Sequence, residues 1–198
     1  MDQFASMFGK KGQVIQFDCR TLQYQYAPLK LERYQLVLFN TNIKHSLAST
    51  AYNQRRDECR QGVEWVQQNL PEVSSLRDVD LPMLNKFVLP KDQLIYNRCK
   101  YIVEENERVV RAVTDLNEGN LQALGDKMYA THDGLSNMYE VSCKELDLLV
   151  NIVKTEPAVL GARMMGGGFG GCTINLVEKT RIEKIVNEVS EKYRQQTG

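Results

Sequence analysis

Five glycines fall among the six residues 166–171 of the stretch Gly161-Ala162-Arg163-Met164-Met165-Gly166-Gly167-Gly168-Phe169-Gly170-Gly171-Cys172-Thr173. Glycine loses more backbone entropy on folding than any other residue, so such a cluster indicates unusual backbone angles or a close approach of the main chain to another group. Two short segments that favour strands flank the cluster, Val159–Met164 and Cys172–Val177. We therefore predict a strand, a glycine loop and a second strand, with backbone N–H groups that could face an anion or another loop.

Two better-known phosphate-binding motifs do not describe this cluster. Gly166, Gly168 and Gly171 have the G-x-G-x-x-G spacing, but that dinucleotide fingerprint needs a helix directly after the glycines, and here a strand is expected. The G-K-[ST] element of the Walker loop is missing as well. On glycine content alone, a flexible hairpin tip stays an equally good description.

Strands are also expected near the start of the chain. Three short segments there are rich in strand-forming residues: Gln13–Cys19, Leu22–Pro28 and Tyr34–Asn40. Turn-forming or charged residues separate them, which is typical of an antiparallel meander. We therefore expect the three strands to pair with one another in chain order.

Helical spacing of apolar residues begins at Ser49 and continues to a stop at Asn69-Leu70-Pro71. A connecting segment to Pro90 has room for one short helix, and a long helix follows that ends near Gly119. Its apolar stripe is expected to consist of Ile102, Val109, Val113 and Leu116. Further helices are expected at about Leu121–Tyr139, at Ser142–Thr155 and from Thr180 onward. These elements predict an α+β fold with an antiparallel sheet packed against several helices, in one domain over residues 1–198.

Composition narrows the class of function. Lys plus Arg and Asp plus Glu number 25 each, so the chain lacks the excess of positive charge that nucleic acids and anionic membranes attract. The five cysteines are far apart and never form a C-x-x-C pair, which argues against a disulfide framework or a zinc site. No apolar run is long enough to span a membrane and no signal peptide is visible, so we expect a cytosolic protein that binds a small molecule or a protein partner.

The glycine stretch 161–173 resembles the third signature motif of the GHMP kinases in its galactokinase form. Four further segments are similar to galactokinase segments in the same order: residues 1–4, 18–20, 42–49 and 139–143. The resemblance implies the ferredoxin-like carboxy-terminal domain of that family, with a helical insertion. It also implies that the amino-terminal half of such a kinase and its last strand are absent from this sequence.

The resemblance also implies roles for individual residues. Asp2 matches the carboxylate beside the sugar hydroxyl that accepts phosphate, where it would orient the hydroxyl and take its proton. Tyr52 matches a position that contacts the sugar, and its alternative is a tyrosine on the core face of the helix. Lys44 could lie near the phosphates, although a surface lysine is the simpler reading. The glycine loop, Gly166, Gly167, Gly168, Gly170 and Gly171, would lie near the phosphates too.

The reaction implied is transfer of the ATP γ-phosphate to the anomeric C1 hydroxyl of galactose, with Mg²⁺ held mostly by residues of the absent half. We expect this chain alone to be inactive. Neither His45 nor His132 sits in a cluster spaced for a metal, so no metal ligand is expected here. Two alternatives remain open: a related GHMP kinase for N-acetylgalactosamine or another monosaccharide, and a non-catalytic galactose sensor that binds a transcriptional regulator.

Overall fold

The computed structural model describes residues 2–43 and 48–197, and within them the side chains of Asp2 and of residues 48–50 are not described. Helices and strands segregate along the chain, as the α+β prediction requires. The elements are α1 (Asp2–Phe8), β1 (Gln13–Phe17), β2 (Tyr24–Pro28), β3 (Tyr34–Asn40), α2 (Ala48–Gln67), η1 (Leu76–Asp78), α3 (Leu81–Phe87), α4 (Gln93–Glu118), α5 (Leu121–Asn137), α6 (Lys144–Lys154), β4 (Val159–Met164), β5 (Cys172–Glu178), η2 (Lys179–Arg181) and α7 (Ile182–Thr197).

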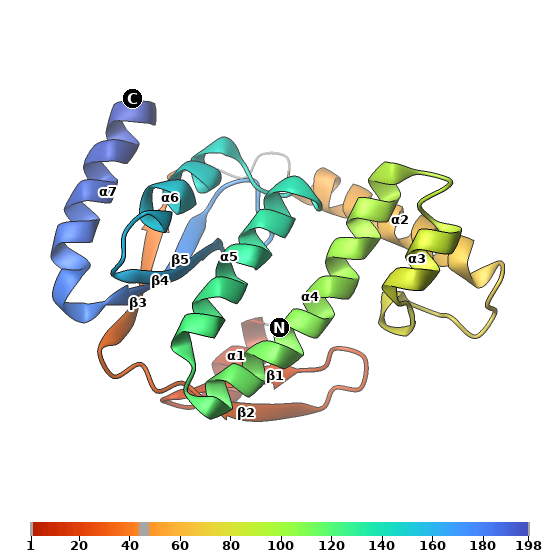
Figure 1. Ribbon diagram of the computed structural model, residues 1–198, viewed down its shortest axis with the longest axis horizontal. Coiled ribbons are helices and arrows are strands. Elements are labelled where there is room, and N and C mark those ends of the chain that lie inside the picture. The colour runs from red at the N-terminus through yellow and green to blue at the C-terminus, as the bar shows by residue number, and fades with distance from the viewer. Residues whose placement is uncertain (1, 44–47, 198) are drawn as a thin grey trace.

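The strands that flank the glycine loop form the predicted unit. β4 and β5 pair antiparallel, with Arg163 opposite Ile174, and β3 pairs antiparallel with the other edge of β5, with Leu38 opposite the same Ile174. The sheet order is therefore β3-β5-β4, and the glycine loop joins the end of β4 to the start of β5 (Figure 1).

The predicted meander is wrong at its third strand. β1 and β2 form a separate two-stranded hairpin, whereas β3 leaves it to join β5, more than 130 residues later in the chain. The reason is burial: Val37 and Phe39 of β3 pack against the same apolar cluster as Val177 of β5. Pairing with β2 would leave these side chains without that core. Residues 2–8 form α1, a helix that the sequence did not predict.

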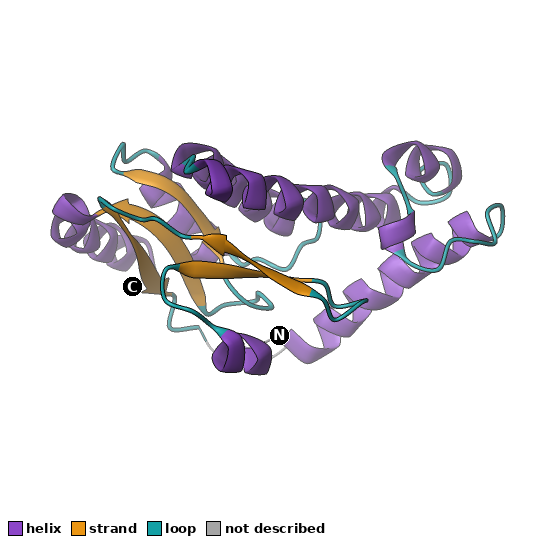
Figure 2. Cartoon of the chain, turned by 90° about the horizontal axis from the view of Figure 1, so that it is seen from below, coloured by secondary structure: helices purple, strands orange, loops and turns teal. Residues whose placement is uncertain are grey.

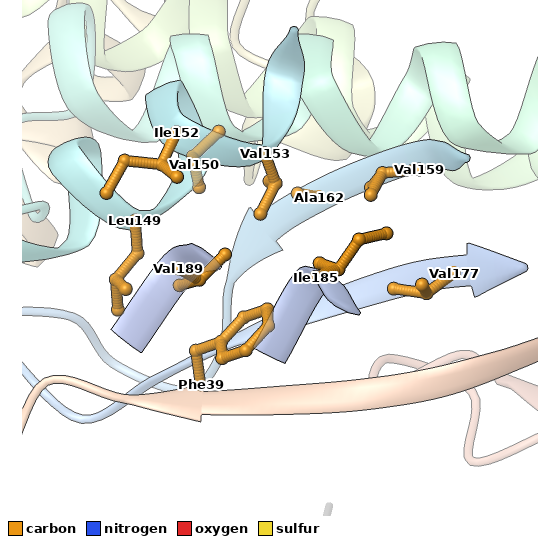
Figure 3. Packing of buried hydrophobic residues seen from close by; sticks show 10 residues of the cluster. All are labelled: Phe39, Leu149, Val150, Ile152, Val153, Val159, Ala162, Val177, Ile185 and Val189. Atoms are coloured by element: carbon orange, nitrogen blue, oxygen red, sulfur yellow. The ribbon is translucent and has the colours of Figure 1, made fainter. Parts of the chain in front are cut away.

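The main core lies between the sheet and the helices α6 and α7. Side chains from one face of the sheet meet the apolar faces of the two helices (Figure 3). The buried members are Phe39, Leu149, Val150, Ile152, Val153, Val159, Ala162, Val177, Ile185 and Val189. Full burial of a side chain of this size contributes about 1.5–3 kcal/mol, so this cluster anchors both strands of the loop unit.

A second core holds α2, α3 and α4 together, at the end of the molecule away from the sheet (Figure 1). α4 begins at the N-cap Asp92 and ends as predicted at Gly119, whose φ of 71° closes the helix in the left-handed conformation. The predicted stripe on α4 is partly wrong, because Val109 is 45% exposed. Figure 2 shows α4 and α5 on one side of the molecule and α1 and α2 on the other.

α5 crosses β4 without space for a side chain between them. A Cβ atom added to Gly125 would lie 2.1 Å from the carbonyl oxygen of Leu160, and one added to Gly161 would lie 2.4 Å from the Cα atom of Gly125. The two backbones therefore touch at this α5–β4 crossing, which sets the position of α5 over the sheet. In the part of the chain that the structure describes, no helix is long and apolar enough to cross a membrane.

Candidate functional site

The glycine loop has an uncommon backbone. Nearly every residue from 166 to 171 has a positive φ, a backbone conformation that residues other than glycine rarely adopt. The angles are 80° at Gly166, 87° at Gly168, 60° at Phe169, 131° at Gly170 and 85° at Gly171. Phe169 is the exception to the glycine rule, and such an outlier persists only where neighbouring contacts hold it.

Those contacts lie at residues 168–171, which we call the inner half of the loop. The Phe169 N–H donates to the carbonyl oxygen of Val141 at 2.7 Å, and a Cβ atom on Gly168 would lie 1.9 Å from the same oxygen. The carbonyl oxygen of Gly171 accepts from both the N–H and the hydroxyl of Thr41, each at 2.8 Å. The inner half is thus docked on two other segments, which a freely moving hairpin tip would not be.

Gly166 and Gly167, the outer half of the loop, have the opposite surroundings. A Cβ atom on either residue would meet nothing within 4 Å, and both residues are exposed. Among the described residues, neither N–H group has a hydrogen-bond partner. Consecutive N–H groups in a turn of alternating handedness form a concavity that suits an anion. The outer half is the part of the loop that an approaching phosphate could reach.

The segment under the inner half is held by two buried arginines. Arg55 of α2 donates to the carbonyl oxygen of Tyr139 at 2.7 Å and to that of Glu140 at 3.2 Å. Arg98 of α4 donates to the carbonyl oxygen of Met138. Residues 138–140, the support segment, therefore have all three carbonyl groups bonded to guanidinium groups immediately before Val141.

Carboxylates balance the charge of these arginines. Arg98 is 1% exposed and bonds Glu58 at 3.1 Å and Glu140 at 2.7 Å, while Arg55 bonds Glu58 at 3.1 Å. The hydrogen bond from Arg98 holds the pKa of the Glu140 carboxyl below its ordinary value. The sequence did not predict this network, because charged residues on amphipathic helices usually face solvent. The available signal was the place of Arg98 between Ile95 and Ile102 on the apolar side of α4.

Outside the loop itself, the structure describes only part of the residues proposed from the resemblance. Tyr52 lies on α2 and is 47% exposed, so it is not a core tyrosine. Burial raises the pKa of the Tyr139 phenol in the support segment, and Cys59 and Tyr52 add to that shift. The side chain of Asp2 and the whole of Lys44 lie outside the described residues. Ile43, directly before Lys44, contacts Gly170, since a Cβ atom there would lie 2.9 Å from the Ile43 carbonyl oxygen.

Of the two histidines, only His132 lies in the described part of the chain. His45 lies outside the described residues, whereas His132 of α5 is buried and its Nδ1 atom accepts the backbone N–H of Met164, the last residue of β4. Within residues 2–43 and 48–197, no group of His, Cys, Asp or Glu side chains is arranged to hold a metal ion.

The sequence that forms the glycine loop, its two strands and most of the covering helices matches a known family model. The model described as GHMP kinases C terminal matches residues 112–195, which include α5, α6, most of α7 and the whole glycine loop. Residues 112–195 are a GHMP kinase carboxy-terminal domain. The resemblance predicted from the glycine stretch is confirmed.

Similar proteins extend the match over nearly the whole length of the chain. A protein of Thermotoga neapolitana named galactokinase is 43% identical over 194 residues, which are 98% of this chain and 53% of the relative. A crystal structure of Lactococcus lactis galactokinase complexed with galactose superposes with a TM-score of 0.92 at 34% identity, over 99% of this chain and 50% of that one. The chain thus spans about half the length of the curated relatives it matches.

A more distant structure shares the fold alone. The mevalonate kinase of L. major, solved in complex with R-mevalonate, has a TM-score of 0.61 at 24% identity. The match covers 100% of this chain and 49% of the mevalonate kinase. The predicted α+β architecture with a helical layer is therefore found in at least two kinases, a galactokinase and a mevalonate kinase.

Proposed function

We propose that this chain is the carboxy-terminal part of a galactokinase, which transfers the γ-phosphate of ATP to the anomeric C1 hydroxyl of galactose. The observation that carries the proposal is the superposition with the galactose complex of a galactokinase at a TM-score of 0.92. Curated relatives named galactokinase, at 43% and 41% identity, support the same sugar over other monosaccharides.

Among the described residues, the glycine loop would contribute hydrogen-bond donors for the phosphoryl group. Phosphoryl transfer consists mostly of alignment and stabilisation of charge on the phosphoryl oxygens. The outer half offers unpaired N–H groups without a side chain in the way, and the docked inner half keeps them in place. Donors that are already oriented stabilise developing charge without reorganisation. We assign the outer half to the phosphates of ATP.

The acceptor side of the reaction is assigned to Asp2 and Tyr52. Asp2 would hold the C1 hydroxyl of galactose and accept its proton, and Tyr52 would place its exposed ring against the sugar. Lys44 follows directly on the segment that contacts Gly170, so its charge would be close to the phosphates. Magnesium would neutralise phosphate charge, and its ligands would come mostly from the other half of the kinase, since the described residues provide no ligand cluster.

The complete kinase is assigned to the cytosol. All five cysteines lie in the described part of the chain and each is a free thiol there, which suits a reducing compartment.

A phosphotransfer assay on the complete protein tests the proposal. With ATP and Mg²⁺, we expect galactose to be phosphorylated with a higher kcat/KM than N-acetylgalactosamine. A preference for the acetylated sugar would favour the related kinase, and galactose binding without turnover would favour the sensor; either result contradicts the proposal. We expect the isolated chain of residues 1–198 to phosphorylate no galactose, because the rest of the kinase is about half of its length.

Asp2→Asn in the complete protein separates the roles of orientation and proton transfer. Asparagine keeps an oxygen that can accept a hydrogen bond from the hydroxyl, but it cannot take the proton. We expect kcat to fall by roughly 10²–10⁴-fold, the usual contribution of a general base, with little change in galactose affinity. Asp57→Asn is the matched control, because it neutralises a surface carboxylate that is 62% exposed. A kcat above about a tenth of the wild-type value would remove the basic role of Asp2.

A further inference from the structure

His132 of α5 connects the strand that leads into the glycine loop with helix α6. Its Nδ1 atom accepts the backbone N–H of Met164 at 3.2 Å, on the edge of β4 that has no partner strand among the described residues. Met164 is the last residue of β4, two positions before Gly166. The side chain of His132 is buried, so this hydrogen bond is shielded from water.

Asp147 of α6 contacts the other nitrogen of the imidazole. The Nε2 atom of His132 lies 3.2 Å from Oδ1 of Asp147. The same Oδ1 accepts the hydroxyl of Ser142 at 2.5 Å, and Oδ2 accepts that of Ser136 at 2.9 Å. One carboxylate thus connects α5, α6 and the residue that follows Val141.

This arrangement determines the state of the imidazole. Because Nδ1 accepts a hydrogen bond, it carries no proton, and the proton of the neutral ring must reside on Nε2, facing Asp147. A second proton on Nδ1 would face the N–H of Met164. Burial also lowers the pKa of His132, although the charge of Asp147 opposes that shift.

The two ends of the network are the two supports of the glycine loop. Met164 leads into the outer half, and Val141, next to Ser142, receives the Phe169 N–H of the inner half. We propose that His132, as the neutral Nε2–H tautomer oriented by Asp147, is a positioning residue that sets the glycine loop for phosphate binding. This role rests on the proposed function and involves no contact with the substrate.

Two conservative variants of His132 in the complete kinase each keep one of its two hydrogen bonds and lose the other. His132→Asn keeps an acceptor near the place of Nδ1 but cannot reach Asp147, and His132→Gln keeps a donor toward Asp147 but loses the acceptor for Met164. His132→Phe loses both with a ring of similar shape. We expect the KM for ATP to rise about tenfold or more in His132→Phe and by less in either conservative variant, while the KM for galactose changes less than twofold.

Thr131→Val is the matched control. Thr131 is the preceding residue of α5, is equally buried and bonds Glu105 rather than any part of the loop. We expect this variant to lose stability without a change in the KM for ATP. An equal effect of Thr131→Val and His132→Phe on that KM would overturn the proposal, because a general loss of stability would then explain both.

Amide exchange gives a second test that needs no turnover. The Phe169 amide reports whether the inner half is docked on Val141, so its hydrogen exchange should be at least tenfold faster in His132→Asn than in wild type. The same amide in Thr131→Val should exchange at the wild-type rate. If the wild-type protein phosphorylates no galactose, the proposed function fails, yet this exchange contrast still decides the positioning role. Unchanged exchange in both His132→Asn and Asp147→Asn would overturn it.

Discussion

The α5–β4 crossing and the outer half of the glycine loop both depend on glycine, for opposite reasons. At the crossing, a Cβ atom on Gly125 or Gly161 would enter the neighbouring backbone. At the outer half, a Cβ atom on Gly166 or Gly167 would meet no protein atom within 4 Å. Packing within the chain therefore requires glycine at the first pair. It does not explain glycine at the second pair, where we infer that a bound ligand is what requires the missing side chain. Substitutions can separate the two cases by their effect on the free energy of unfolding.

Gly125→Ala should have the largest effect on that free energy. Alanine is the better helix former by about 1 kcal/mol, but its Cβ atom would lie 2.1 Å from the Leu160 carbonyl oxygen, and backbone atoms would have to move apart. Overpacking usually costs about 1–3 kcal/mol and occasionally more, and we expect about 4 kcal/mol here because the contact is between two backbones that no side-chain rotation can separate. After the gain in helix propensity of about 1 kcal/mol, the net loss by denaturant titration should be about 3 kcal/mol. Gln122→Ala, on the exposed side of α5, should stay within about 0.5 kcal/mol of wild type. A stabilised Gly125→Ala protein would mean that the crossing has space to spare.

Gly168→Ala should follow, because the inner half resembles the crossing. The added Cβ would lie 1.9 Å from the Val141 carbonyl oxygen, at a φ of 87°. The left-handed conformation alone costs a residue with a Cβ about 1–2 kcal/mol, and we expect a total loss of about 2 kcal/mol together with reduced phosphotransfer. Thermal unfolding and kinetics on the same preparation measure both. Wild-type values for the larger Gly168→Val variant would restore the description of a flexible tip.

The sequence alone predicted the local elements on both sides of this contrast, but not the tertiary contacts that produce it. The helix ending at Gly119 and the strands around the loop were predicted well, since local periodicity and glycine placement define them. The partner of β3 was not, because pairing depends on a core assembled from residues more than 130 positions apart. Nor could sequence separate Gly167 from Gly168, because the difference lies in the Val141 carbonyl brought beside only one of them. Arg98 and His132 were missed for a similar reason: their buried partners come from other elements.

Protonation of His132 should make the free energy of unfolding depend on pH, with a smaller effect than that of Gly168→Ala. His132 has a folded pKa below its ordinary value of 6.5, because burial outweighs the attraction of Asp147 and Asp133, and Lys154 acts in the same direction as burial. The unfolded chain therefore binds the proton first, so stability is complete above pH 6.5 and declines as the pH falls below it. Urea midpoints between pH 5.0 and 7.5 measure this decline.

His132→Asn provides the control for the pH series. Without the imidazole, the slope between pH 6.5 and the folded pKa of His132 should decrease, while Gly125→Ala should keep the wild-type slope at a lower overall stability. An unchanged slope in His132→Asn would assign the decline to other groups.

Gly167→Ala should have the smallest effect on stability and is the sharpest probe of the outer half. Its φ is not in the left-handed region and its Cβ would enter open space, unlike Gly166, where a φ of 80° would add strain. We expect a free energy of unfolding within about 0.5 kcal/mol of wild type. If a phosphate approaches this backbone, however, the methyl group must displace it, and an overpacking cost of about 1–3 kcal/mol corresponds to a KM for ATP about tenfold higher or more. An alanine at 167 that left both stability and the KM for ATP unchanged would show that no ligand comes near the outer half, and the phosphate assignment of Gly166 and Gly167 would have to be given up.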